Sequence, residues 1–390
     1  MTIPSSTTPS PGITVGAYYF PGFHVDPRNE RDMGEGFTEW KLVKESRPRF
    51  EGHRQPKVPL WGYRDESQPA VMEQNIEAAS THGIDCFLFD WYWYEDAPFI
   101  QRPLDEGFLG ASNVGKMKFA LMWANHDWTH IFPLGLRQES PLLHPGAVSK
   151  PVFAHLTEHI IERYFSHPGY LKIDGKPYFS IFQLQKFLDG FGGLDGARVA
   201  VDEFRARVAR AGFPGVHLNT MVNLWGAPLI PGDPVVQNQQ EIIRALGFDS
   251  LTSYVWPNTL GPEDFPLTDY RLVGDKARRK WDEIAAAYHM PYFPNVTTGW
   301  DCSPRARQSD PFVRWDYPFS PVCKNNTPEA FREALELARD WVLRQPQGHK
   351  LITLNAWNEW TEGSYLEPDE EFGMSRLEAV AAVFGRRPGA

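Results

Sequence analysis

Short hydrophobic runs recur eight times along the chain, and each is followed by a longer stretch in which apolar residues have helical spacing. The runs are rich in β-branched and aromatic residues, as buried strands are. They cover residues 14–20, 85–92, 118–124, 178–184, 216–223, 250–256, 292–298 and 351–357. This alternation predicts a parallel sheet with helices outside it, and eight strands is the number that closes a barrel.

The helical stretches complete the repeating unit. They lie at about 69–82, 98–110, 151–167, 196–212, 239–247, 269–288, 327–346 and 375–385. A doubly wound sheet is the alternative, but the turn after the first strand reads YYFPGF instead of the G-x-G-x-x-G of a dinucleotide fold. The sequence predicts one α/β domain, a (β/α)8 TIM barrel over residues 13–390, after a polar tail over residues 1–12 that we expect to be disordered.

Two connections from strand to helix, 21–68 after strand one and 299–326 after strand seven, are too long to be simple turns. Both carry glycine, proline, aromatic and acidic residues. Long loops in a compact domain are usually functional, and in a barrel these loops form the face that holds the active site. We therefore expect them to build the walls of a cleft.

Composition and net charge limit the classes of ligand that the protein could bind. The 390 residues carry a net charge of -10, which argues against a nucleic-acid or anionic-membrane partner and favours a neutral or cationic ligand. The 14 Trp, 14 Tyr and 26 Phe suit the apolar faces of sugar rings, although composition alone favours the plainer view that they fill a large core.

The three cysteines have no metal-binding spacing, and a bridge between Cys302 and Cys323 stays open. We expect no cofactor and no metal. The chain shows no basic, apolar leader at its start and no apolar run of 18 residues, so we expect a cytoplasmic protein.

The strongest chemical signal follows strand eight, in the segment NAWNEWTEG over residues 355–363. Glu359 and Glu362 are close enough to face one bound sugar, and glycoside hydrolysis needs such a pair to protonate the departing oxygen and assist attack. We expect Trp357 and Trp360 to flank the pair and partly desolvate it, and we count Trp357 and Asn358 among the substrate-binding candidates. The plainer alternative makes both glutamates solvated residues at a helix start.

Other strand ends add candidate sugar-binding groups. The segment after strand three, Trp123, Asn125, His126, Asp127 and Trp128, suits hydroxyl recognition better than metal binding, because side chains of sequence neighbours diverge on an extended chain. On strand two, Asp90 and Trp91 point to opposite faces, and Asp90 could be a third carboxylate or a structural group. Further candidates at strand ends and in the following loops are Tyr19, His24, Asn223, Tyr254, Trp256 and Trp300.

Four segments together resemble a known group: AYYFPGFHVDP with GEGFTEW (34–40), RPL (102–104), WANHDWT (123–129) and NAWNEWTEGSYLEPD (355–369). The chain resembles the WbsX-like, glycoside hydrolase family 99-like proteins, relatives of the endo-α-mannosidases, over residues 13 to about 370. The resemblance implies a (β/α)8 barrel, no metal and a retaining mechanism.

In the endo-α-mannosidases, the first glutamate of the matching motif deprotonates the 2-hydroxyl of the sugar, which attacks the anomeric carbon to give a 1,2-anhydro sugar. The second glutamate is the acid/base. Carried over by resemblance, Glu359 is the base and Glu362 the acid/base, and Tyr254 is the expected partner of Glu359 from its position.

The chain departs from this group at two places. Many WbsX-like proteins read W-A-N-E-N-W where this chain has WANHDW (123–128), and Y-H-Y-W where it has DWYW (90–93). Reaction type can transfer while substrate does not. The first hypothesis is a glycosidase acting on an oligosaccharide or polysaccharide, with a manno- or rhamno-configured sugar as a first guess. A glycosyltransferase of surface-polysaccharide synthesis and a non-catalytic sugar-binding barrel are the alternatives.

Overall fold

The protein is described from a computed structural model that covers residues 12–222, 237–256, 260–346 and 348–385. The tail predicted to be disordered falls almost wholly on residues 1–11, which lie outside the described residues, as does Asn223.

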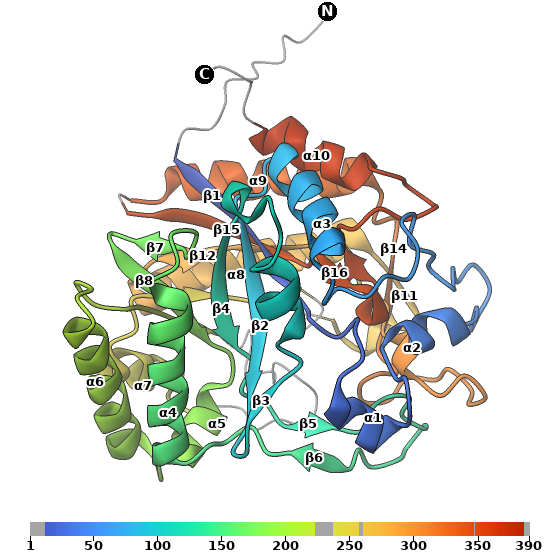
Figure 1. The fold of residues 1–390 in the computed structure, drawn as a ribbon. Coiled ribbons are helices and arrows are strands. Elements are labelled where there is room, and N and C mark those ends of the chain that lie inside the picture. Colours follow the sequence, from blue (N-terminus) through green and yellow to red (C-terminus); the bar gives the residue numbers. More distant parts are fainter. Residues whose placement is uncertain (1–11, 223–236, 257–259, 347, 386–390) are drawn as a thin grey trace, which may run out of the picture.

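A parallel barrel forms the centre of the molecule and confirms the predicted fold (Figure 1). The strand order is β12-β10-β9-β8-β4-β2-β1-β15-β13, and every neighbour in it is parallel. The two strands at the ends of this order, β12 and β13, are consecutive pieces of the seventh predicted strand, separated by Pro294. Because β12 pairs with β10 and β13 pairs with β15, the sheet closes on itself. The barrel strands are β1 (Ile13–Tyr19), β2 (Cys86–Trp93), β4 (Lys118–Trp123), β8 (Lys176–Ile181), β9 (His217–Met221), β10 (Ser250–Thr252), β12 (Tyr292–Phe293), β13 (Asn295–Thr297) and β15 (Lys350–Asn355).

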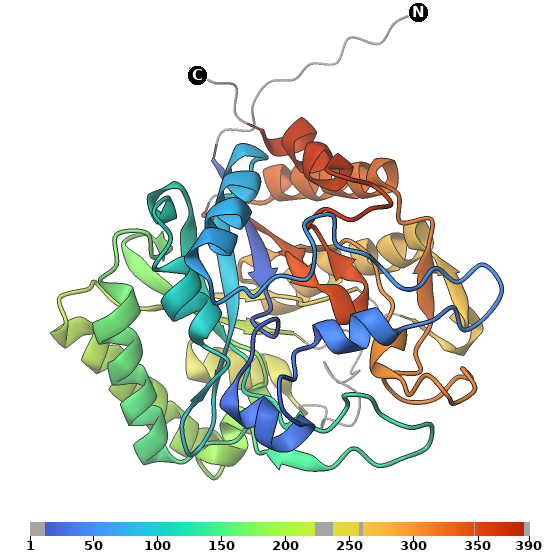
Figure 2. The same cartoon turned by 45° about the vertical axis from the view of Figure 1, so that its right-hand side comes forward.

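Helices surround the barrel, and most begin where the sequence predicts. Figure 2 shows them packed on the outer side of the strands. Proline opens α3, α4 and α9 at their first or second helical position, where its missing N–H costs no hydrogen bond. The outer helices are α3 (Pro69–Thr81), α4 (Lys150–Ile160, continued by the π-helix η3, Ile161–Phe165), α6 (Leu194–Arg210), α7 (Gln239–Leu246), α8 (Tyr270–Tyr288), α9 (Pro328–Arg344) and α10 (Ser375–Phe384).

The helix predicted over 98–110 is wrong in its first part. Pro98–Phe99 form a short strand, β3, that pairs antiparallel with the end of β2, and only Pro103–Phe108 wind into a π-helix, η1. The pairing joins Tyr92 to Phe99, so the chain turns back on β2 before it becomes helical. A hydrophobic periodicity cannot distinguish such a hairpin arm from the first turn of a helix.

The long loops carry their own secondary structure. The loop after β1 contains α1 (Pro27–Met33) and α2 (Trp40–Glu45), and the loop after β13 contains η7 (Ser303–Arg305) and β14 (Val322–Lys324). A third long loop, missed in the sequence, follows β4 and forms the hairpin of β5 (Trp128–Thr129) and β6 (Leu142–His144). Figure 1 shows α1 and this hairpin at the end of the barrel where β2 runs into β3, which is the carboxyl end of the strands.

The remaining elements are short and connect these parts. They are η2 (Val114–Lys116), β7 (Lys172–Ile173), α5 (Leu184–Gly190), η6 (Pro262–Asp264), β11 (Leu267–Asp269), β16 (Asn358–Glu359), η8 (Trp360–Glu362) and β17 (Ser364–Tyr365). Among the described helices, none combines the length and apolar character that crossing a membrane requires.

The interior of the barrel holds a chain of polar side chains. Ser180 donates to Asn219 Oδ1 at 2.8 Å, and Asn219 Nδ2 donates to Ser250 Oγ at 2.9 Å. Elsewhere in the barrel, Asn295 Nδ2 donates to Thr353 Oγ1 at 3.1 Å. Buried polar groups that find partners in this way fix the register of neighbouring strands.

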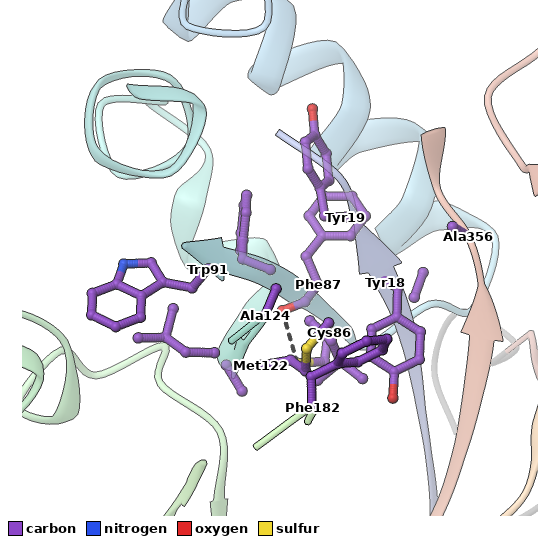
Figure 3. Packing of buried hydrophobic residues seen from close by; sticks show 14 of the residues in the cluster. Tyr18, Tyr19, Cys86, Phe87, Trp91, Met122, Ala124, Phe182 and Ala356 are labelled. Atoms are coloured by element: carbon purple, nitrogen blue, oxygen red, sulfur yellow. Dashed lines mark hydrogen bonds between the residues drawn. The ribbon is translucent and has the colours of Figure 1, made fainter. Parts of the chain in front are cut away.

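Side chains alternate between this interior and the helices, which decides what reaches the site. Figure 3 shows Tyr18 and Tyr19 leaving β1 on opposite sides. Tyr18 lies inside, with its ring 4.9 Å from that of Tyr254, whereas the hydroxyl of Tyr19 lies 3.3 Å from the sulfur of Met72 on α3. The same period of two sends Asp90 inward and Trp91 outward on β2.

Candidate active site

A cavity of about 380 Å³ lies at the carboxyl ends of the barrel strands. This volume is in the range of ordinary ligand pockets. Its walls come from the ends of β2, β4, β8 and β10, from the loop after β13 and from the segment after β15. The residues that line it include Phe20, Asp90, Tyr92, His126, Asp127, Trp128, Phe132, Phe182, Tyr254, Trp300, Arg305, Arg314, Trp315, Tyr317, Glu359 and Glu362.

Asn358 fixes the segment that carries the two glutamates. Its side chain accepts a hydrogen bond from Phe20 N at 2.8 Å and donates to Phe20 O at 2.7 Å, so it pairs with the chain after β1 as a strand would. The same Nδ2 lies 2.9 and 3.0 Å from the two carboxyl oxygens of Glu66. All these groups are buried. The contacts of Asn358 with Phe20 and with Glu66 therefore hold the backbone that precedes Glu359.

A tight turn then brings Glu362 back to the same cavity. Residues Trp360–Glu362 form one 3-10 turn, η8, which ends at Gly363 with φ 64°. A methyl group on Gly363 would lie 2.7 Å from Cβ of Asp301, so both the left-handed conformation and the space require glycine. This turn places both carboxyl groups on the wall of one cavity.

Glu359 is buried and contacts the hydroxyl of Tyr254. This hydroxyl lies 3.0 Å from Glu359 Oε1 and 2.8 Å from Oδ2 of Asp90. The other oxygen, Oε2, has no hydrogen-bond partner among the described residues and lies 3.7 Å from Nη2 of Arg305. Of the two oxygens of Glu359, Oε2 is therefore the one that the described residues leave without a hydrogen bond.

Glu362 has a different environment, made by two donors. Arg305 Nη1 donates to Glu362 Oε1 at 2.8 Å, and the hydroxyl of Tyr317 donates to the same oxygen at 2.9 Å. Arg305 also donates to Tyr317. The two glutamates thus share a cation but have different hydrogen-bond partners.

Arg305 is held from behind by Glu39, which lies just before α2 in the loop after β1. Arg305 Nη2 lies 3.0 Å from Glu39 Oε2 and 3.3 Å from Oε1, and Thr361 donates to the same carboxylate. Phe20 and Phe132 lie over the guanidinium, with ring centroids 5.8 and 5.7 Å from it. Three buried carboxyl groups, those of Glu39 and the two glutamates of the motif, therefore surround one guanidinium.

Burial sets the charge state of this cluster. Burial raises the pKa of Glu359 well above its usual value, and the neighbouring Glu362 adds to the rise. Burial also raises the pKa of Glu362, which Arg305 and Tyr317 oppose. The pKa of Asp90 is raised well above its usual value for the same reason, against its hydrogen bond from Tyr254. Raised carboxyl pKa values are what acid–base chemistry near neutral pH needs.

Eight of the residues predicted to form the site do line the cavity. They are Glu359, Glu362, Asp90, Tyr254, Trp300, His126, Asp127 and Trp128. Tyr254 is the hydrogen-bond partner of Glu359, as expected from its position. Burial lowers the pKa of His126 to about 4, so its imidazole is neutral near pH 7. Asp127 forms an ion pair of 2.6 Å with Lys186.

Eight others lie away from the cavity, so we correct those predictions. Tyr19, Trp91, Trp123 and Trp357 are on the outward faces of their strands or strand ends, where their rings pack on α3, α4, η3 or neighbouring aromatic side chains. The side chains of three others form hydrogen bonds with backbone groups of neighbouring segments: Asn125 with Gln183, Trp256 with Asn295 and Asn358 with Phe20. The imidazole of His24 shares a hydrogen bond with Pro21 O in its own turn.

Trp357 and Trp360, which we expected beside the two glutamates, do not line the cavity. Trp360 stacks on Tyr365 with ring centroids 3.7 Å apart, and its indole N–H donates to Glu367 at 2.7 Å, away from the cavity. The rings that line the cavity beside the glutamates come from other loops, among them Phe20 and Phe132. Composition shows many aromatic residues but not which of them turn toward a site.

Among the residues that contact this cluster, Glu39 and Tyr317 were not singled out in the sequence. Glu39 lies within the quoted segment GEGFTEW, and this was the available signal. Tyr317 lies in the loop 299–326 that was expected to form a wall of the cleft, but no motif distinguished it from the other aromatic residues of that loop. Cys302 and Cys323, whose pairing was open, are free thiols in a small apolar cluster with Val255 and Trp300.

The barrel and its cavity define the class of protein, which is a TIM-barrel protein with paired carboxyl groups at the carboxyl ends of its strands. More particularly, the chain belongs to the family described as "Glycosyltransferase WbsX", which matches residues 15–380. Two curated relatives, both "Uncharacterized protein WxcX" from strains of Xanthomonas campestris pv. campestris, are 27% and 26% identical over 388 and 386 residues. These matches cover 96% of this chain and 50% of each relative, so the chain spans about half their length.

Solved structures with the same fold include two glycosidase-like proteins. A "Glycoside hydrolase-like protein" superposes with a TM-score of 0.62 at 15% identity, over 96% of this chain and 95% of that one. The GH99 endo-α-mannosidase from Bacteroides thetaiotaomicron has a TM-score of 0.54 at 12% identity, over 95% of each chain. At these identities the likeness shows the fold, and the resemblance to this group predicted from the motifs is confirmed at that level.

Proposed function

We propose that the protein is a glycoside hydrolase that cleaves a glycosidic bond in an oligosaccharide or polysaccharide with retention of configuration. The observation that carries this proposal is the pair of buried glutamates in one cavity, of which one has a free oxygen and the other has two donors. Glu359 is the base and Glu362 the acid/base in the proposal. The fold shared with a GH99 endo-α-mannosidase supports it by analogy.

The two environments suit the two roles. Glu359 Oε2 has no hydrogen-bond partner among the described residues, so it can accept the proton of a sugar 2-hydroxyl. The 2-oxygen then attacks the anomeric carbon, while Glu362 gives its proton to the departing oxygen. In the second step water attacks the anomeric carbon, gives its proton to Glu362, and the 2-oxygen takes its proton back from Glu359. The intramolecular attack needs no further positioning of a nucleophile.

The charge of the cavity favours a neutral sugar donor over a nucleotide sugar. Its lining carries five acids, Asp90, Asp127, Asp316, Glu359 and Glu362, against two arginines, of which Arg305 is already bound by three carboxyl groups and Arg314 lies on the loop after β13. A diphosphate would have to enter this field against like charge. The family's description nevertheless makes a glycosyltransferase the second candidate.

The test is a panel of aryl α- and β-glycosides and bacterial polysaccharides, with manno- and rhamno-configured sugars first, followed by NMR of the released sugar. We expect the first product to have the configuration of the substrate. Glu359→Gln and Glu362→Gln should each lower turnover by about 10²–10⁴, whereas Glu378→Gln, exposed on α10, should leave it unchanged.

Leaving-group chemistry separates the two roles. Glu362→Gln should lose much less activity on a dinitrophenyl glycoside than on an alkyl glycoside, because a good leaving group needs no proton. Glu359→Gln should lose activity on both. Inversion of configuration would refute the anhydro-sugar route, full activity of both variants would refute the assignment, and transfer from a nucleotide sugar with no hydrolysis would favour the second candidate.

A further inference from the structure

Three oxygen atoms on the wall of the cavity are linked by hydrogen-bond distances. The hydroxyl of Tyr254 is 2.8 Å from Asp90 Oδ2 and 3.0 Å from Glu359 Oε1. Both distances are those of good hydrogen bonds. All three side chains line the cavity, and they come from β2, from the chain after β10 and from β16.

A tyrosine hydroxyl has one hydrogen to donate. If Asp90 and Glu359 were both ionised, Tyr254 could donate to only one of them, and the other carboxylate would face a lone pair at hydrogen-bond distance. The arrangement is satisfied when one carboxyl group carries a proton and donates it to the tyrosine oxygen. The three groups then form a continuous chain of two hydrogen bonds with one direction.

The surroundings of the two carboxyl groups decide which one holds the proton. Glu359 Oε2 lies 3.7 Å from the guanidinium of Arg305, which favours its charged form. Within the described ranges, no Lys or Arg side chain lies within ion-pair distance of Asp90, and its Oδ1 is buried without a hydrogen-bond partner.

The remaining titratable groups near Asp90 are acidic or neutral. They are Tyr18 from β1, Tyr92 from its own strand, Tyr254 after β10, and Glu359 and Glu362 after β15. None of them favours a charge on Asp90 except through the hydrogen bond from Tyr254. Burial raises the pKa of both Asp90 and Glu359 well above their usual values, but Arg305 opposes the rise only at Glu359.

We propose that Asp90 keeps a proton in the resting enzyme and donates it to the oxygen of Tyr254, so that Tyr254 donates its own hydrogen to Glu359. Asp90 is then a positioning residue that acts through Tyr254. It turns the tyrosine hydroxyl toward Glu359 Oε1 and leaves Oε2 as the free, ionised oxygen of that carboxylate.

The consequence for catalysis rests on the proposed function. When Glu359 takes the proton of a sugar 2-hydroxyl on Oε2, it becomes neutral beside a neutral Asp90, and the hydrogen bond from Tyr254 to Oε1 remains. The return of that proton in the second step restores the resting state. Asp90 neither donates nor accepts a proton during the proposed reaction, but its own proton determines that Glu359 is the carboxyl group that acts as the base.

The first test needs no substrate. Infrared difference spectra of the resting protein at pH 7, with and without ¹³C in the aspartate side-chain carboxyl groups, report protonated aspartic acid through its carbonyl stretching band. We expect a neutral-acid band that shifts with the label, is missing in Asp90→Asn and moves in Tyr254→Phe, where the acceptor of the acid hydrogen is lost. Absence of a labelled neutral-acid band in the unmodified protein would overturn the proposal, whether or not either variant folds.

The second test uses the pH dependence of kcat/KM on whichever glycoside is cleaved. Asp90→Asn has the shape and charge of protonated aspartic acid, so its acidic limb should stay within about 0.3 pH units of the parent. If Asp90 were ionised, removing a charge about 6 Å from Glu359 would lower that limb by about two pH units at an effective dielectric constant of about 20. Such a shift would overturn the proposal.

The two tests separate this inference from the proposed function. An infrared signature of protonated Asp90 in a protein that cleaves no glycoside would keep the proton assignment and reject the hydrolase. Turnover of a glycoside by a protein without that signature would support the hydrolase and reject the proton assignment. Tyr254→Phe should raise the acidic limb, because Glu359 loses its hydrogen-bond donor, and this change distinguishes the linked chain from simple packing.

Discussion

Replacing Glu66 with glutamine should make the stability of the protein less dependent on pH. Glu66 lies in a buried pair with Glu367 behind the segment that carries the two glutamates of the site. Glu367 accepts hydrogen bonds from Arg64 at 3.0 Å and from the indole of Trp360 at 2.7 Å, whereas Glu66 accepts from the neutral amide of Asn358. Burial and the neighbouring Glu367 raise the pKa of Glu66 well above its usual value.

The direction of the effect follows from proton counting. Between the unfolded pKa of about 4.3 and the raised pKa of Glu66 in the folded protein, the folded state binds one proton more than the unfolded state. The free energy of unfolding therefore falls by about 1.4 kcal/mol for each pH unit as the pH rises through this window. Over pH 5 to 8 the contribution reaches at most about 4 kcal/mol, and Glu66→Gln removes it.

Urea unfolding of the parent and of Glu66→Gln at pH 5, 6, 7 and 8 measures the difference directly, without a substrate. We expect the variant to gain stability relative to the parent as the pH rises. Glu378→Gln, exposed on α10, is the control and should run parallel to the parent. Parallel curves for Glu66→Gln as well would show that Glu66 is ionised in the folded protein, and would refute the reasoning from burial.

Three further predictions concern the cavity. Arg305→Met should raise the acidic limb of the pH–rate profile by at least about one unit and lower kcat/KM, because both glutamates lose a cation within 4 Å; an unmoved limb would contradict this. Gly363→Ala should cost about 1 kcal/mol or more in unfolding free energy and lower kcat, since its φ is 64° and the new methyl would meet Asp301; full activity would contradict it. Trp315→Ala should raise KM for a polysaccharide more than for an aryl glycoside, because this half-exposed ring lies on the cavity wall. The control is Leu272→Ala, which removes an equally exposed side chain elsewhere. Equal changes in the two KM values, or the same effect in the control, would contradict the prediction.

The barrel could be predicted because strand and helix periodicities alternate over the whole chain. Within the described ranges, seven of the predicted helices and all eight strands lie within a few residues of their predicted positions, apart from the break at Pro294. The elements that were missed are short helices and strands, and the strands among them depend on pairing with other segments. The β5–β6 hairpin, for example, contributes Trp128 and Thr129 to a two-stranded ladder that no local pattern indicates.

The direction of a side chain was predictable where a residue lies on a strand, whereas residues after the strands, such as Glu362 and His126, were found from their place in a motif. Asp90 follows the period of two on β2, and its neighbour Trp91 must then point outward, so only one of these two candidates could reach the cavity. Loop residues carry no such constraint. Tyr317 and Glu39 reach the cluster because their loops fold over the barrel end, which depends on contacts between segments far apart in sequence.

The proposed chemistry also reconciles the family's description with the fold. In a retaining mechanism the first step activates a sugar and the second step transfers it to an acceptor, which is water in a hydrolase and a sugar hydroxyl in a transferase. Both outcomes use the same base and the same acid/base, and neither requires a nucleotide. The carboxyl groups of Glu39, Glu359, Glu362 and Asp90 suit such a neutral donor in this proposal, in which Asp90 and Glu362 carry protons and the four groups together with Arg305 have one excess negative charge instead of three. In the proposed mechanism, the choice between hydrolysis and transfer therefore lies with the part of the cavity that binds the acceptor and not with the acid pair.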